Sequence, residues 1–219
     1  MDWKVFDMKA RKLVKAQVLL AAVLLTLAVG MALQGQNVYA KTIKRVAYNG
    51  VMKYKGTAYC ASCAGIYKVK IRNGKVVSKT CLMKEKVCYG PYSLAGSMRK
   101  KGGYVYYVEG TNGTVSYLKR VGIRSHKSQL LSNYSTRYAI KGKKLYYSVE
   151  KDWTKTAHKV MTLNGKHKKK TSMKVKMTNK SSNVKGYKIV EKEKGKYVIS
   201  YLKTPKGKYK LGKVFNYSY

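Results

Sequence analysis

Apolar and cationic residues alternate along most of the chain after position 40. In Tyr67-Lys68-Val69-Lys70-Ile71-Arg72, the apolar residues share one face of a strand and the cations share the other. Ser172–Thr178 alternates in the same way, whereas Leu145–Val149 and Lys196–Leu202 are richer in aromatic and branched residues. A period of two is typical of β-strands, and no stretch after position 40 keeps a helical period for three turns. The pattern predicts an all-β protein.

Short turn sequences separate the predicted strands. Asn-Gly occurs at positions 49–50, 73–74, 112–113 and 164–165, and Thr204-Pro205-Lys206-Gly207 supplies a further turn. Asn-Gly is a strong hairpin signal because both residues tolerate a positive φ. Proline occurs only at Pro91 and Pro205, so it interrupts few strands. We therefore expect neighbouring strands to be antiparallel.

The strands also group into repeated units. Each unit has a Tyr-containing strand, a loop and a second apolar strand, and the units span residues 56–75, 103–121, 143–166 and 186–203. The first of these is a degenerate copy. They recur at intervals of about 40 to 47 residues, which is the length of one propeller blade. The sequence predicts a propeller-like array of about four antiparallel repeat units.

The pattern of Gly-x-x-(Leu/Val)-Tyr-Tyr, a loop, an apolar strand and Asn-Gly-Lys resembles the repeats of secreted bacterial β-propeller-like proteins. These are the TolB-like or low-density-lipoprotein-receptor-like propellers of Gram-positive anaerobes, and the resemblance covers residues 51–215. Those relatives often carry Asp-Gly in the turn, and they often have more blades than this chain could form. The resemblance implies scaffolding or binding, and it supplies no catalytic residues.

The ends of the array leave two possibilities open. In a closed ring, we expect residues 43–46 to pair with residues 214–217 in a shared last blade. The alternative is an open array that needs a partner.

The first forty residues differ in composition from the rest. A basic lead consists of Lys9, Arg11, Lys12 and Lys15. The apolar run 18–33 and the tripeptide Val38-Tyr39-Ala40 follow it, a layout typical of a signal peptide cleaved after Ala40. An uncleaved anchor is the alternative, although the run is shorter than the roughly 17 to 25 residues of a spanning helix. We expect a signal peptide at 1–40, a mature domain at 41–219, and a secreted or cell-surface protein of a Gram-positive bacterium.

Four cysteines lie in the predicted mature chain: Cys60, Cys63, Cys81 and Cys88. An exported chain meets an oxidising environment, so we expect one or two disulfides in the first unit, and four cysteines allow three pairings. A zinc ribbon is a second interpretation, but six residues separate Cys81 from Cys88 where a ribbon has two. A redox Cys-x-x-Cys is a third, but a strand follows the motif where that chemistry uses a helix.

Catalytic patterns are not found in the sequence. His126, His158 and His167 have no metal-ligand spacing, and we interpret them as solvated loop residues. Asp152 is the only Asp after position 7, which argues against carboxylate cages for calcium, paired-carboxylate hydrolysis and a Ser-His-Asp triad. Neither a nucleophile elbow nor a phosphate-binding loop occurs. We expect a non-enzymatic protein without a metal or cofactor.

Positive charge is the strongest compositional feature. The chain carries 48 Lys and Arg against 8 Asp and Glu, a net charge of +40. Solubility needs a net charge of only roughly 2 to 8, and excess charge repels itself, which a polyanion would relieve. Lysine predominates over arginine, which favours delocalised attraction over planar recognition.

The basic residues concentrate at three places. The candidate polyanion-binding residues are Arg99, Lys100, Lys101, Lys141, Lys143, Lys144, Lys166, Lys168, Lys169 and Lys170. Anionic cell-wall polymers are the expected partners, since they are abundant outside the membrane. The alternatives are nucleic acid, bound through phosphates and Tyr stacking, and carbohydrate, bound by one exposed Tyr of each pair Tyr106/Tyr107 and Tyr146/Tyr147. A membrane contact is expected only through an uncleaved N-terminal segment.

Overall fold

The described part of the chain is built from strands. The computed structural model describes residues 42–47, 50–88, 98–110, 115–135, 137–152, 155–181 and 184–217. They belong to one compact unit, Lys41–Tyr219. Within these ranges there are eighteen strands and no helix, so no described helix could span a membrane. The all-β prediction is confirmed, whereas the predicted signal peptide and its cleavage site lie outside the described residues.

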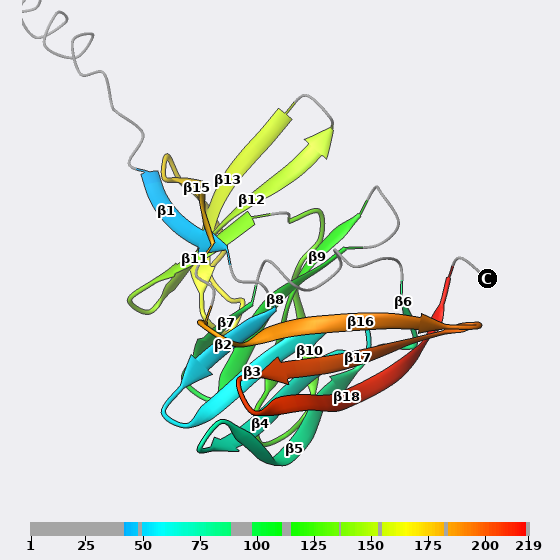
Figure 1. The fold of residues 1–219 in the computed structure, drawn as a ribbon. Helices are drawn as coiled ribbons and strands as arrows, with labels where there is room; N and C mark the ends of the chain where they lie inside the picture. Colours follow the sequence, from blue (N-terminus) through cyan, green and yellow to red (C-terminus); the bar gives the residue numbers. More distant parts are fainter. Residues whose placement is uncertain are drawn as a thin grey trace, which may run out of the picture. The chain divides into compact units, whose positions relative to one another are not determined.

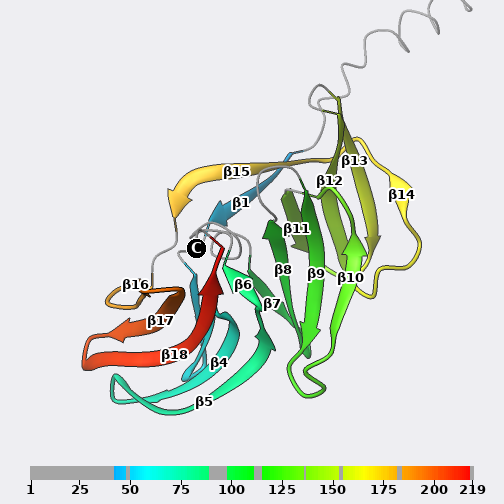
Figure 2. The ribbon, with the colours of Figure 1, turned by 90° about the vertical axis from the view of Figure 1, so that its right-hand side faces the viewer.

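Sixteen of the strands form four sheets of four (Figures 1 and 2). Sheet I contains, in order, β2 (Val51–Tyr54), β3 (Thr57–Ser62), β4 (Gly65–Arg72) and β5 (Lys75–Lys84). Sheet II contains β10 (Ser128–Ser132), β9 (Ser116–Gly122), β8 (Tyr104–Gly110) and β7 (Arg99–Lys101). Sheet III contains β11 (Arg137–Lys141), β12 (Lys144–Asp152), β13 (Lys155–Thr162) and β14 (Lys169–Lys170). Sheet IV contains β16 (Lys188–Lys194), β17 (Tyr197–Thr204), β18 (Gly207–Asn216) and β6 (Val87–Cys88).

Each predicted repeat unit falls in one sheet. Residues 56–75 lie in sheet I, 103–121 in sheet II, 143–166 in sheet III and 186–203 in sheet IV. Neighbours along each sheet are antiparallel, except that β6 runs parallel to β18. The propeller-like array of four units is thus confirmed. The unit taken as degenerate, 56–75, belongs to a complete four-stranded sheet.

Turn chemistry follows the sequence where the turns are described. The β4–β5 hairpin turns through Asn73 and Gly74, whose φ angles are 49° and 76°. Gly165, after β13, has a φ of 87°. The positive angles favour Asn-Gly at 73–74 and glycine at position 165. The Asn-Gly pair at 112–113 and Asn49 lie outside the described residues.

Three apolar clusters join the sheets in the order IV, I, II and III. One contains Cys60 and Val69 of sheet I with Leu202 of sheet IV. The second joins sheet I to sheet II, and the third joins sheet II to sheet III. Sheet II therefore has a neighbour on each face, and both faces are apolar.

Burial of sheet II on both faces corrects the prediction for one tyrosine pair. Tyr107 packs in the cluster toward sheet I and Tyr106 in the cluster toward sheet III, and each is 1% exposed. Their hydroxyls are satisfied inside the protein, Tyr106 by the Leu163 carbonyl at 2.9 Å and Tyr107 by Ser128 Oγ at 2.8 Å. The expectation that one of them is exposed is wrong. In the second pair Tyr146 is half-buried and Tyr147 is buried.

The predicted pairing of the chain ends is also wrong. Residues 43–46 belong to β1 (Thr42–Ala47), which pairs in parallel with β15 (Lys174–Ser181). Residues 214–216 belong to β18, which has β17 on one side and β6 on the other (Figure 2). Because both edges of β18 are occupied there, it has no free edge for the N-terminal strand.

Candidate anion-binding site

A Lys-Gly pair lies at the first hairpin turn of each four-stranded sheet: in sheet I the pair forms the β2–β3 turn, and in the other three sheets the lysine ends the strand and the glycine begins the turn. The pairs are Lys55-Gly56, Lys101-Gly102, Lys141-Gly142 and Lys194-Gly195. The four glycines have φ angles of 71°, 56°, 60° and 53°, a region that glycine adopts without steric cost. The tight turn requires the glycine, and the lysine before it places one cation at each turn.

A cavity of about 500 Å³ lies beside the second of these turns. Two turns of sheet II form it, the β7–β8 turn at Gly102-Gly103 and the β9–β10 turn at 123–127, together with Tyr59 of sheet I. The Ile123 amide donates to the Gly103 carbonyl at 2.8 Å, and Tyr104 pairs with Gly122. These backbone contacts hold the two turns together, so the cavity is built on paired strands.

Glycine leaves the cavity open on one side. A Cβ at Gly102 or Gly103 would meet no heavy atom of the described residues within 4 Å. Larger side chains at these positions would occupy space that a ligand could use. The backbone of the β7–β8 turn therefore borders the cavity directly.

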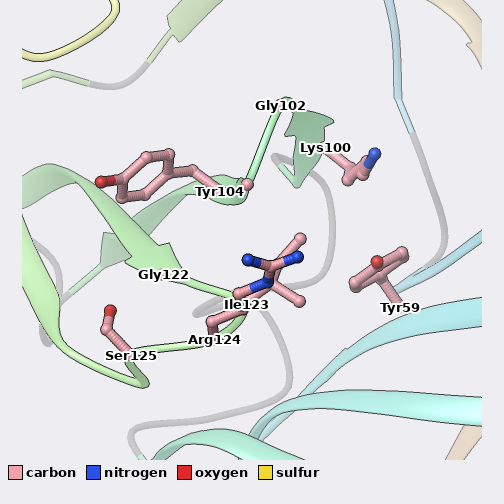
Figure 3. A pocket seen from close by; sticks show the side chains of 9 residues that line it. Tyr59, Lys100, Gly102, Tyr104, Gly122, Ile123, Arg124 and Ser125 are labelled. Atoms are coloured by element: carbon pink, nitrogen blue, oxygen red, sulfur yellow. The ribbon is translucent and has the colours of Figure 1, made fainter.

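Two cations and two aromatic residues line the cavity (Figure 3). Arg124 is exposed and Lys100 is half-buried. In the view of Figure 3, the Arg124 guanidinium lies between Tyr104 and Tyr59, and Lys100 lies on the Tyr59 side. Among the described residues that line the cavity, none is acidic. The lining therefore favours an anion.

Arg120 fixes the tyrosine at the edge of the cavity. Its guanidinium carbon lies 4.0 Å from the centre of the Tyr104 ring, a cation–π contact. Arg120 also donates to Gln129 Oε1 at 2.8 Å and to the Leu163 carbonyl at 2.9 Å. Tyr104 stays 37% exposed, so part of its side chain remains available for a ligand.

Lysines of sheet III lie next to this end of sheet II. Leu163, which accepts the bond from Arg120, directly follows Thr162, and Thr162 pairs with Lys144. The β11–β12 turn and the turn after β13 therefore share one end of sheet III, against sheet II. We call the resulting surface the basic rim, and it consists of Lys100, Lys101, Arg124, Lys141, Lys143, Lys144 and Lys166.

Six of the ten predicted polyanion-binding residues belong to this rim, and four lie elsewhere. Arg99 is half-buried and donates to the carbonyl of Met98 at 2.8 Å. Lys168, Lys169 and Lys170 are exposed, and the last two lie on β14 at the edge of sheet III. The sequence pattern did not point to Arg124, Tyr59 or Tyr104. Only the Lys-Gly repetition, at the β7–β8 turn, could have pointed to this place.

A second, smaller cavity of about 220 Å³ lies between sheet III and β15. It contains Ser148 and His158, whose Oγ and Nδ1 atoms are 3.2 Å apart, and also Glu150. His158 lies in β13 and is half-buried, so its prediction as a solvated loop residue is wrong. Burial and the charge of Lys174 lower its pKa, which favours the neutral imidazole. His126 and His167 are exposed in turns, as predicted.

The described residues give no support to the interpretation of the cysteines as a zinc site. Across the described ranges, no group of three or more His, Cys, Asp or Glu side chains could hold a metal ion.

Comparisons with known proteins give distant structural neighbours. No family model matches the chain, and no curated protein matches it. Two solved structures each match at 9% identity and a TM-score of 0.40. One is a Saccharomyces cerevisiae complex in which a Dbp5 variant is bound to Nup159, a Gle1 variant, IP6 and ADP. The other is the N-terminal domain of Nup159. Both alignments cover 70% of this chain and 38% of the other, so the chain spans well under half of these neighbours. The computationally designed Ika4 protein matches at 13% identity and a TM-score of 0.37, over 77% of this chain and 93% of that one. None of these similarities is close enough to support a functional argument.

Proposed function

We propose that the protein is an exported, non-enzymatic binding protein that associates with anionic polymers at the bacterial cell surface. The observation that carries the proposal is the cavity of about 500 Å³ with Arg124, Lys100 and Tyr104 in its lining and no described acidic residue. Ligand pockets in proteins commonly enclose about 300 to 1,000 Å³. One charged repeat of a polymer fits this space, and the chain of the polymer continues over the basic rim.

The chemistry of the lining favours a phosphate or carboxylate on a sugar or polyol. An arginine donates two parallel hydrogen bonds to such a group, and a lysine adds a point charge. A partly exposed tyrosine such as Tyr104 offers a flat apolar surface to the carbon skeleton. Beyond the cavity, the turn lysines attract further charges of the polymer without requiring one geometry.

The predicted export of the chain directs the choice of polymer. Wall-linked phosphate polymers of the teichoic acid type are abundant just outside the membrane of a Gram-positive bacterium. Their repeating phosphates match a surface on which cations follow one another from turn to turn. This assignment rests on the predicted signal peptide and on the basic rim together.

Binding to isolated cell walls tests the proposal. We expect the protein to bind walls with teichoic acid, to release as salt rises, and to bind poorly once the teichoic acid has been stripped. Arg124→Gln should weaken binding by about 10- to 150-fold, since a hydrogen bond to a charged group contributes about 1.5 to 3 kcal/mol. Arg137→Gln is the matched control, because it removes the same charge from the exposed Arg137, outside the rim. Equal binding to native and stripped walls would contradict the proposal.

Exposure of Tyr104 favours single-stranded nucleic acid as the second candidate. Aromatic side chains beside cations stack on bases in a sequence-tolerant manner. A competition experiment separates the two: poly(glycerol phosphate) and single-stranded oligonucleotides of equal charge are added to the wall-bound protein. Stronger displacement by the oligonucleotide would transfer the assignment to nucleic acid.

A further inference from the structure

Two of the four cysteines meet where sheet I packs on sheet IV. Cys63 lies in the turn between β3 and β4, and Cys88 ends β6, the last strand of sheet IV. Both belong to the apolar cluster between the two sheets and are 4% and 3% exposed. The Cys63 thiol is hydrogen-bonded to the Cys88 thiol, so the two sulfur atoms are neighbours.

The other two cysteines cannot pair with each other in this fold. Cys60 of β3 pairs with Tyr67 of β4, and Tyr67 pairs with Cys81 of β5. Two strand spacings of about 4.8 Å separate Cys60 from Cys81, about 9.6 Å in all. A disulfide needs Cα atoms less than about 7 Å apart. Cys60 is buried, whereas Cys81 is exposed.

We propose that Cys63 and Cys88 form an intramolecular disulfide that joins sheet I to sheet IV. In the step, one thiolate attacks a sulfur of an external disulfide, such as an oxidised small thiol or a thiol oxidase, and displaces one thiolate. The second cysteine then attacks the mixed disulfide and displaces the other. The cysteine pair loses two protons and two electrons, and the external disulfide becomes two thiols.

A half-buried carboxylate holds Cys63 in place. Glu191 of β16 accepts from the Cys63 amide at 2.6 Å and from the Cys63 thiol at 3.0 Å. Ser200 of β17 donates to the same carboxylate at 3.3 Å, and its Oγ accepts from the Ala64 amide at 3.3 Å. Oxidation removes the hydrogen bonds that involve the thiol of Cys63 and leaves the bond from its amide. The remaining bonds keep the β3–β4 turn on sheet IV.

The cross-link would secure a strand that is otherwise weakly held. β6 has only two residues, and it pairs with Phe215 and Asn216 of β18. The Tyr217 amide adds one bond to the Cys88 carbonyl at 3.1 Å. So few backbone bonds fix a strand poorly, and a covalent bond from Cys88 to sheet I would hold both β6 and the end of β18 that pairs with it.

Burial determines when the bond forms. The hydrogen bond with Cys88 and the loss of hydration raise the pKa of the Cys63 thiol, and the thiolate is the reactive form. The folded dithiol is therefore a poor nucleophile. We expect oxidation during folding, before β6 docks, and we expect the finished bond to resist reductants.

Peptide mapping tests the pairing directly. The full-length chain is refolded in a mixture of reduced and oxidised glutathione, its remaining thiols are alkylated, and it is digested with trypsin without reduction. Cleavage after Lys and Arg yields peptides 56–68 with Cys60 and Cys63, 80–84 with Cys81, and 87–99 with Cys88. We expect 56–68 joined to 87–99 and an alkylated Cys81.

Variants assign the bond within the shared peptide. Cys60→Ala should keep the cross-link, and Cys63→Ala should abolish it. A link from 56–68 to 80–84, a bond between Cys60 and Cys63, or four alkylated cysteines would each overturn the proposal. The peptide map of the unmutated chain tests the proposed pairing even if a variant does not fold.

Thermal unfolding tests the role of the bond. Protein refolded with its thiols kept reduced should have a Tm about 5–10 °C below that of the oxidised protein, as expected for a disulfide in a domain of this size. Cys81→Ala should keep this difference, and Cys88→Ala should remove it. An identical Tm for the oxidised and reduced forms would show that the bond does not hold the two sheets together.

Discussion

Two arginines only four positions apart have different roles because of their burial. Arg120 is 9% exposed, and its guanidinium donates hydrogen bonds to Gln129 and to the Leu163 carbonyl, so it stabilises the fold. Arg124 is exposed at the cavity, where its planar cation is available to a ligand. The two could not be distinguished in the sequence, because neither lies in a basic run and their difference arises from the neighbouring sheet.

Ionisation of Glu85 destabilises the folded state. It lies between sheets I and II near Glu109, and Glu109 forms an ion pair with Lys119. Loss of hydration, then the charge of Glu109, raises the pKa of Glu85 to about 7, although Lys119 opposes the shift. A raised pKa means that the folded state keeps the proton longer than the unfolded chain. The protonated Glu85 therefore contributes its full stabilisation at a pH below the usual pKa of 4.5. This stabilisation is lost as the pH rises through about 7.

Glu85→Gln should therefore stabilise the protein at pH 8 and have little effect at pH 5. We expect a gain of about 1 kcal/mol at pH 8, after allowing for the partial exposure of the side chain. Thermal unfolding at the two pH values measures it. The control is Glu193→Gln, which removes an exposed carboxylate of β16. A gain of equal size at both pH values would refute a role for ionisation.

At the scale of elements, the sequence predicted local turns, but it did not predict which distant strands pair. Asn73-Gly74 predicted its hairpin because the positive φ is a property of those two residues. The two-residue strand β6 has no pattern of its own and exists because β18 offers an edge. β1 pairs with β15 for the same reason, since pairing depends on which edges the rest of the fold leaves open. The cavity was equally hidden, because two turns 20 residues apart build it.

Gly65 lies where the backbone of β5 leaves no room for a side chain on β4. It begins β4 with a φ of 127°, and a Cβ there would overlap the Met83 carbonyl oxygen of β5. Gly65→Ala should lower the free energy of unfolding by about 2–4 kcal/mol, because the clash adds to backbone strain. Urea denaturation measures the change. Gly103→Ala is the control, because its Cβ meets open space, and it should cost under about 1 kcal/mol. Equal losses in both variants would mean that the Met83 carbonyl does not require glycine.

At the scale of the whole molecule, like charges oppose the fold. The net charge is +40, and the chain has only 8 acidic residues to compensate it. Lysine pairs even face each other across strands, as Lys141 faces Lys144 and Lys188 faces Lys203. Facing like charges destabilise a sheet, and the polymer that the protein is proposed to bind would screen them.

Salt should therefore stabilise the free protein. Raising NaCl from 20 mM to 500 mM shortens the screening length from roughly 20 Å to roughly 4 Å, so the repulsion between surface lysines falls. We expect Tm to rise by several degrees across this range and to rise similarly with a low concentration of poly(glycerol phosphate). A Tm that is independent of both would argue against strong repulsion at the surface.

The salt dependence of polymer binding tests the central claim most directly. The affinity for poly(glycerol phosphate) is measured across a salt series for the unmutated protein and two variants with three Lys→Gln changes each. One variant changes Lys141, Lys143 and Lys144 of the basic rim, and the control changes the exposed Lys188, Lys192 and Lys203 of sheet IV. Each phosphate contact contributes about 0.7–0.9 to the slope of log affinity against log salt, so the rim variant should lose about 2–3 from the slope. The control should keep it. Equal slopes in the two variants, or an affinity that ignores salt, would contradict binding of an anionic polymer at the basic rim.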